Sequence, residues 1–370
     1  EINVHGAQVL SKKWSTLSLV HISNQFVETD VNKDGFRDMP IGYIAAAMHR
    51  WNFEGKNSEA KFGIKAILGD KQGGQLGSSS DAPLGSAWNA RFKTQHVELF
   101  AKNGYFLKKR KFGSIGLIGQ AKYHEMHNTF GNTSYEGTQR KIYLNSIYGD
   151  IIGNTNHNIK TGLSFLLDDY DQTYNDSTFL KTEIVPGAYA EYTYNSNDKV
   201  IVVAGFRADY HNLYGPLITP RIHGKWNISK KNALRVSVGR GYRVPNPFAD
   251  YNSQMASSRL WVVSPDIVPE DGISAGVTFT QKFLVNDNVA SFTIDYFYTH
   301  FLNQLVVDMD ISANEVHIYN TNATSFSHSA QAELSIQPAK GFELRSAFKY
   351  YDVRGTFNNI LTQLRIVLMN

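Results

Sequence analysis

Apolar residues fall at every second position along most of this chain, in stretches separated by polar connections. Residues 290–298 are an example, with two alternating sets. The apolar set is Ala290, Phe292, Ile294, Tyr296 and Tyr298, and the polar positions between and after them are Ser291, Thr293, Asp295 and Thr299. A period of two predicts β-strands with one apolar and one polar face. The polar faces are rich in Arg, Asp and Glu, which rarely line a packed core, so they favour a wet lumen.

The connections between these strands alternate between short and long. The short ones are predicted at 54–59, 108–111, 149–158, 195–198, 227–232, 285–287 and 338–340, and the long ones at 28–40, 69–91, 128–141, 168–183, 243–270 and 306–316. An up-and-down barrel in a bacterial outer membrane has short periplasmic turns on one rim and long extracellular loops on the other. We therefore predict an all-β, antiparallel transmembrane barrel, with a soluble β-sandwich as the alternative.

The prediction places about 16 strands in residues 1–355, from a first strand at 2–10 to a last one at 342–353. Residues 356–370 break the alternation, so we expect an irregular, truncated end there. The sequence begins with Glu1 and has neither a leading Met nor a signal peptide, although an exported protein needs a signal peptide. The chain is thus expected to be an internal segment of a larger barrel.

Composition supports this picture and excludes several classes of function. No run of about 18 apolar residues is present, and aromatic residues make up 13% of the chain, as expected for rings at two membrane interfaces. The absence of cysteine excludes disulfides and thiol chemistry. A solvated turn accounts for the basic run at 108–111, so no nucleic-acid partner is expected, and no spacing typical of a catalytic site or phosphate loop occurs. We expect no enzyme activity.

Several motifs stand in a fixed order between residues 185 and 351. The run GRGYRVPNPF at 239–248 precedes SPDIVPE at 264–270, and GFRAD at 205–209, TPR at 219–221 and DYFYTHF at 295–301 complete the set. Together they resemble the TonB-dependent outer-membrane receptors. The Asp-rich segment near residue 30 and the strand around Trp51 resemble versions of the family found in Bacteroidetes.

The resemblance implies a full barrel of 22 strands, an N-terminal plug and energy drawn from the TonB complex. The sequence contains no plug, so contact with TonB would run through a segment outside it. Outer-membrane lipid, a metal-chelate ligand and a surface lipoprotein are the other partners implied. The function expected is TonB-dependent uptake of a large, scarce nutrient, with a passive porin and a calcium-dependent surface-binding protein as alternatives.

The ligand class stays open at this stage between cobalamin, a siderophore and haem. Residues 244–270 contain no His, which disfavours haem. Cobalamin is favoured over siderophores, because some of its receptors bind calcium in extracellular loops.

Aromatic and charged residues of the predicted loops are the candidate ligand contacts. Arg243 and Glu270 flank the longest loop, and an ion pair that anchors this loop is the favoured interpretation, with direct ligand contact by Arg243 as the alternative. The candidates for ligand contact are Trp88, Tyr135, Tyr174, Tyr214, Arg243, Tyr251 and Trp261.

The segment 30–38 resembles the first part of a calcium-binding loop. Oxygen ligands are expected from Asp30, Asn32, Asp34, Asp38 and the carbonyl of Phe36, with Gly35 at the sharp turn. The Glu expected at the twelfth position is missing, because Ile41 stands there. Calcium is the predicted cofactor, and an Asx turn held by its own hydrogen bonds is the alternative. No organic cofactor is expected.

Overall fold

The computed structural model describes residues 1–77, 87–357 and 360–369 and is built almost entirely of strands. Its elements are β1 (Ile2–Val9), β2 (Trp14–Gln25), β3 (Ile41–Glu54), β4 (Ser58–Gly74), β5 (Asn89–Phe106), β6 (Ser114–Phe130), β7 (Thr133–Ile152), β8 (Asn154–Tyr174), β9 (Ser177–Ser196), β10 (Val200–His211), β11 (Gly215–Asn227), β12 (Asn232–Arg243), α1 (Pro247–Asp250), η1 (Asn252–Ser257), β13 (Leu260–Val263), β14 (Glu270–Val285), β15 (Asn288–Asp308), β16 (Glu315–Thr321), β17 (Ser325–Ala339), β18 (Phe342–Phe357) and β19 (Ile360–Met369). None of the helices described is long and apolar enough to cross a membrane.

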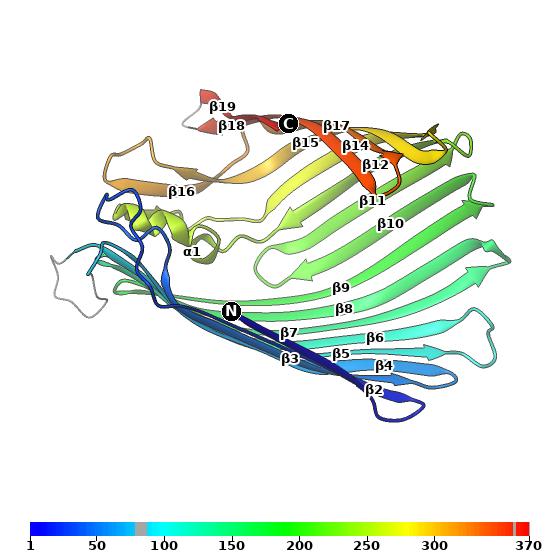
Figure 1. Ribbon diagram of the computed structural model, residues 1–370, viewed down its shortest axis with the longest axis horizontal. Helices are drawn as coiled ribbons and strands as arrows, with labels where there is room; N and C mark the ends of the chain where they lie inside the picture. Colours follow the sequence, from blue (N-terminus) through cyan, green and yellow to red (C-terminus); the bar gives the residue numbers. More distant parts are fainter. Residues whose placement is uncertain (78–86, 358–359, 370) are drawn as a thin grey trace.

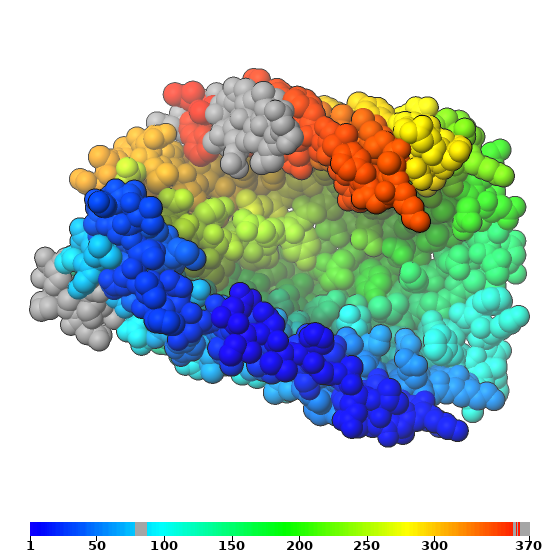
Figure 2. All heavy atoms as spheres, viewed as in Figure 1, coloured from blue at the N-terminus to red at the C-terminus, as the bar shows by residue number. Residues whose placement is uncertain are grey.

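All strands except β13 and β16 form one antiparallel ladder in chain order. From β1 to β18 this ladder holds sixteen strands, the number predicted. The sheet curves into a trough whose hollow face is seen in Figure 2. Among the described residues, β1 pairs only with β2 and β19 only with β18, so the sheet is a curved wall with two free edges.

The predicted alternation becomes rows of like residues across neighbouring strands. Ile294 lies opposite Phe279 on β14 and Ala332 on β17, whereas Asp295 lies opposite Thr278 and Gln331. Ile294 is 47% exposed, as suits a side chain on the outer, lipid-facing surface of the wall. The polar rows line the inside of the trough. The fold is therefore the predicted transmembrane barrel wall.

The two rims differ in the predicted way. In Figure 1 the short turns gather at the right-hand edge, while α1 and β16 lie toward the left. Two of the predicted long loops are different, however. Residues 128–141 and 168–183 continue the ladder as strand, to the pairs Phe130–Thr133 and Tyr174–Ser177. Asn175, at positive φ, helps to close the second hairpin.

These extended hairpins make β7, β8 and β9 20 or 21 residues long. About 9–11 residues cross a bilayer, so the three strands project well beyond it at the long-loop rim. Sequence reasoning missed this because Asp168, Asp169 and Asp171 gave the segment the polarity of a loop. The cross-strand ion pairs described below offset that polarity.

The end of the chain also differs from expectation. Residues 360–369 form β19, which pairs with β18 from Phe357–Ile360 to Lys349–Met369, with a register shift at Val353/Arg354. The expectation of an irregular end over residues 356–370 was therefore wrong for 360–369. Backbone pairing with a long neighbouring strand outweighs the lost alternation, since ladder hydrogen bonds do not depend on side-chain pattern.

Candidate functional site

The longest loop, residues 244–269, folds down onto the inner wall of the trough. Pro245 and Pro247 end the pairing of β12, and Asn246 caps the short helix α1 through its side chain. This places Phe248 on top of the extended strands. Its ring centroid lies 4.7 Å from that of Phe179, 5.6 Å from Tyr174 and 5.7 Å from Trp261. Phe248 is only 4% exposed, so the loop has a small hydrophobic core of its own.

A second loop contributes to the same core. β13 pairs in parallel with β16, and β16 pairs antiparallel with the end of β15. Leu305, Val316 and Ile318 from these elements are buried in one cluster with Met255 and Phe248. The two long loops around β13 and β16 therefore form one packed unit above the wall.

Polar contacts fix this unit to the strand ends. Arg243 Nε donates to Glu270 Oε2 at 2.6 Å, and Arg243 Nη1 lies 3.1 Å from Asp250 Oδ2. The other Glu270 oxygen accepts from the backbone N–H of Leu305 at 3.0 Å. Burial raises the pKa of the Tyr251 hydroxyl, against the opposing effect of its hydrogen bond with Arg243. Arg243 is thus held by two carboxylates, in a geometry that suits the anchoring role.

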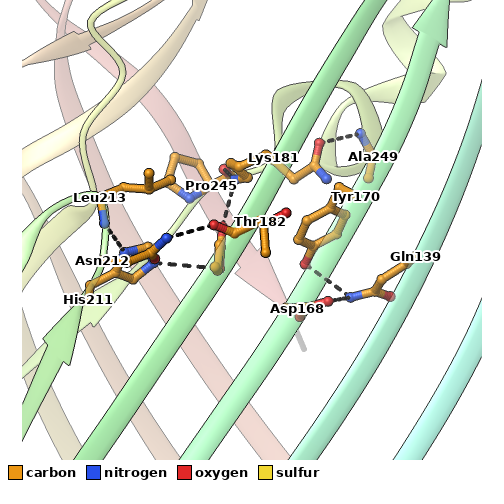
Figure 3. Close-up of polar contacts among 12 residues, drawn as sticks. Gln139, Asp168, Tyr170, Lys181, Thr182, His211, Asn212, Leu213, Pro245 and Ala249 are labelled. Carbon is orange, nitrogen blue, oxygen red and sulfur yellow. Dashed lines mark hydrogen bonds and ion pairs between the residues drawn. The ribbon is translucent and has the colours of Figure 1, made fainter.

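A band of charge crosses the inner wall beneath the loop unit. Six residues stand in register across β4 to β9: Lys65, Glu98, Lys122, Lys141, Asp168 and Glu183. Lys141 Nζ lies 3.1 Å from Asp168, whose other oxygen accepts from Gln139 at 2.7 Å. Asp168 is only 2% exposed, and Gln139 also donates to Tyr170 (Figure 3). Because anions and cations alternate or pair here, the band carries little net charge.

Lys181 links this band to the loop above it. Its ammonium donates to the carbonyl of Pro245 at 3.2 Å and lies 2.7 Å from Glu183, as Figure 3 shows in part. His211 lies 3.7 Å from the same carboxylate. The loop is therefore joined to the wall by a charged group as well as by the Phe248 cluster.

Below the band, Asp209 organises a second polar cluster on the inner wall. It accepts from Arg207 at 2.6 and 2.7 Å and from the Tyr242 hydroxyl at 3.1 Å. Arg207 also donates to Ser164 at 2.8 Å. Gly187 stands opposite Asp209, and any side chain there would collide with the carboxylate.

An open pocket of about 390 Å³ adjoins this cluster. Its lining includes Tyr189, Arg207, Arg221, Arg240 and Tyr242. Three guanidinium groups and two phenols can donate hydrogen bonds to anionic oxygen atoms. The pocket is thus a candidate binding site for an oxygen-rich anion. Arg207, Arg221 and Tyr242 occur in the GFRAD, TPR and GRGYR motifs, but no local sequence pattern indicates that these motifs converge on one pocket.

The structure places the predicted ligand contacts in different environments. Tyr135, Tyr174 and Trp261 are 2%, 7% and 6% exposed, so their rings lie inside the loop core. Trp88 and Tyr251 pack against the same core from outside it. The ring of Tyr214 lies tilted against that of His211, with ring centroids 4.7 Å apart. In this arrangement the first three are structural, and contact with a ligand would require the loop unit to lift.

The segment 30–38 forms a compact turn closed by its own side chains. Asp30 accepts from the N–H groups of Asp34 at 3.1 Å and Gly35 at 3.0 Å, and Asp34 accepts from that of Phe36 at 2.8 Å. Asp38 accepts from the N–H of Val31 at 2.7 Å. Asn32 bonds to the side chain of Asp34.

These contacts are those expected of an Asx turn. Over residues 1–77, 87–357 and 360–369, no three His, Asp or Glu side chains are placed to hold one ion together. Calcium stays a prediction of the sequence.

Comparisons with known proteins agree with this architecture. The family model described as TonB dependent receptor-like, beta-barrel matches residues 30–365. No curated protein sequence matches the chain. Among solved structures, the siderophore receptor PirA from Pseudomonas aeruginosa is similar with a TM-score of 0.68 and 10% identity, over 95% of this chain and 64% of that one.

Two further structures are similar in the same way. The outer membrane transporter YddB from Escherichia coli gives a TM-score of 0.67 at 11% identity, over 99% of this chain and 58% of that one. The ferripyoverdine receptor of the Pseudomonas aeruginosa outer membrane gives 0.64 at 11% identity, over 95% and 54%. Such identities show a shared fold. The chain spans about 54–64% of the length of these three proteins.

Proposed function

The chain belongs to the family of TonB-dependent receptor β-barrels, and from that premise we propose that it forms the barrel wall of an outer-membrane receptor for a metal chelate. Uptake is driven by the TonB complex, which reaches the receptor through a part outside this sequence. The match of the family model to residues 30–365 supports the receptor class. The solved relatives named above include receptors for siderophores and for ferripyoverdine.

The pocket beside Asp209 is the observation from which we infer the class of ligand. Metal chelates such as ferric siderophores present carboxylate, phenolate or hydroxamate oxygens, which accept hydrogen bonds. Arg221 and Arg240 line the pocket, although each also has a carboxylate partner, Glu191 at 2.8 Å and Asp271 at 2.5 Å. Their remaining N–H groups are available to an anionic ligand, because each guanidinium has five donors. We propose that ligand descends past the lifted loop unit to this pocket.

Binding to the intact receptor tests the ligand class. Quenching of tryptophan fluorescence is measured in detergent with ferric siderophores, cobalamin and haemin. We expect a chelate with anionic oxygens to bind. A double variant, Arg221→Gln with Arg240→Gln, should weaken binding by about 10- to 100-fold, since a hydrogen bond to a charged group contributes about 1.5–3 kcal/mol.

Arg140→Gln is the matched control, because this Arg lies on the outer face in an ion pair with Asp169. It should leave affinity unchanged. Transport is then measured in cells with and without TonB. Uptake that persists without TonB, or free passage of unrelated small solutes through the protein in liposomes, would point to a passive porin.

A further inference from the structure

The rim formed by the short turns carries an open pocket of about 580 Å³ that none of the functions above uses. It lies at the ends of β9 to β12 and β14. Six cationic side chains line it: Lys199, Lys225, Lys230, Lys231, Arg235 and Lys282. Asp198 is the one acidic residue in the lining, and its carboxylate already accepts from Asn195 at 3.0 Å. The local excess of positive charge is larger than the net charge of +4 of the whole chain.

Unlike the arginines farther along the same strands, the six cations of the pocket have no acidic partner among the described residues. Within the described part of the chain, none of the six takes part in an ion pair shorter than 4.0 Å, and Arg235 donates only to the hydroxyl of Thr280, at 3.3 Å. Arg207, Arg221 and Arg240, on the same strands, are each paired with a carboxylate. Crowding six like charges costs free energy that an anion in the pocket would offset.

The backbone around the pocket is held in place before any ligand arrives. The N–H of Asn227 donates to the carbonyl of Lys199 at 2.8 Å, and the N–H of Lys282 donates to that of Lys231 at 2.7 Å. These bonds tie neighbouring turns together. Ser229 Oγ accepts from the N–H groups of Lys231 and Asn232, both at 3.1 Å, and shapes the turn itself. The cations are therefore carried on a preorganised frame.

Strand alternation places the pocket on the inner side of the wall. Lys225 lies opposite Arg235 across β11 and β12, in register with the neighbouring rows that hold Arg221 and Ser237 inside. Trp226 and Val236 alternate with them and are 47% and 49% exposed on the outer face. The pocket thus opens toward the mouth of the lumen and not toward lipid, which disfavours a lipid headgroup as its ligand.

We propose that this pocket binds an acidic peptide segment at the short-turn mouth of the barrel. Five of the six cations are Lys, whose ammonium groups are compact charges on flexible stems. Arg, in contrast, suits planar, two-point recognition of a single phosphate. The cations are spread over several strands about 4.8 Å apart. An extended peptide with carboxylates along its length matches this spread, whereas a small anion could reach only a few of the charges at once.

Fluorescence anisotropy on the intact receptor in detergent tests the proposal. The probe is a fluorescein-labelled decapeptide of alternating Glu and Ser, and the control probe has Gln in place of Glu. We expect only the Glu peptide to bind, with affinity that falls as salt is raised from about 50 to 300 mM because the charges are screened. Lys225→Gln with Lys231→Gln should weaken binding at least tenfold, and Arg replacements at both positions should retain it.

Lys108→Gln with Lys109→Gln is the matched control, because it removes two charges from another short turn of the same rim. It should leave peptide affinity unchanged. Heat-dependent migration on gels establishes that every variant is folded. Equal loss of affinity in both double variants, or equal binding of the Gln peptide, would overturn the proposal. So would binding of inorganic phosphate or of anionic vesicles at this pocket in the absence of peptide binding.

Discussion

At the long-loop rim, Phe248, Trp261 and Met255 turn two loops into a packed unit, and the two cations that hold the loop, Arg243 and Lys181, each have a carboxylate partner. At the short-turn rim, the turns are tied together by backbone hydrogen bonds, but six cations have no acidic partner within the part of the chain that the structure describes. Both rims are ordered by local contacts. At the long-loop rim, polar groups bind one another and hold the loop unit closed. At the short-turn rim, the cations are available to bind another molecule.

Among the changes considered, removing the ring of Phe248 should have the largest effect on the difference between the two rims, because it should open the loop unit. Phe248→Ala deletes the centre of the loop core and should cost about 3–5 kcal/mol of the free energy that holds the loop unit closed. We expect rapid protease cleavage within residues 244–269 and loss of amide protection there. Leu260→Ala, at a side chain 58% exposed, is the control and should change neither. If both variants resist protease equally, the loop core is not what closes this rim.

The wall between the rims offers the next largest effect. Ile294→Arg puts a charge on the outer face and should destabilise the protein by about 2–4 kcal/mol if the residue lies near the bilayer midplane. Thr293→Arg, one residue away on the inner face, should cost far less. Reversible unfolding in lipid measures both. Equal costs at the two positions would mean that the two faces, on which both rims depend, have been assigned wrongly.

The ion pair at the base of the loop should contribute less. A double-mutant cycle of Arg243→Gln and Glu270→Gln isolates their coupling. Gln keeps an oxygen that can accept from Leu305, and Arg243 is about half exposed, so we expect a coupling of about 1 kcal/mol or less. The coupling free energy is measured from the protection of residues 244–269 against amide hydrogen exchange in the four variants of the cycle. Coupling of several kcal/mol would show that charge, and not the Phe248 core, holds the loop unit.

Calcium should have the smallest effect on the long-loop rim. Because Ile41 stands where a calcium loop has its bidentate Glu, we expect binding no tighter than about 10⁻⁴–10⁻³ M, the range of weak extracellular sites. Calorimetry on the intact receptor measures the affinity, and Asp30→Ala with Asp34→Ala should abolish the heat. The absence of heat at millimolar calcium would leave the segment as an Asx turn alone.

The alternation of apolar and polar residues predicted the architecture because it is a pattern between residues that are adjacent in the sequence. The apolar set around Ile294 and the polar set around Asp295 are each visible in nine residues, and a period of two has one structural meaning. The same reasoning failed for residues 168–183, where polar side chains indicated a loop. Their polarity is balanced by Lys141 and Gln139, which belong to a different strand, and no local pattern could reveal that.

The sequence by itself determined the strands of the antiparallel ladder, their number up to residue 357, their two faces and the positions of the short turns. It also marked Arg243 and Glu270 as the flanks of the longest loop. Only the tertiary structure decided that this loop folds inward, that its own Trp261 is buried against Tyr135 and Tyr174 of the wall, and that cations from several strands gather at the opposite mouth. The physical reason is range: strand pattern is encoded between adjacent residues, whereas burial and charge balance depend on contacts between segments far apart in the chain.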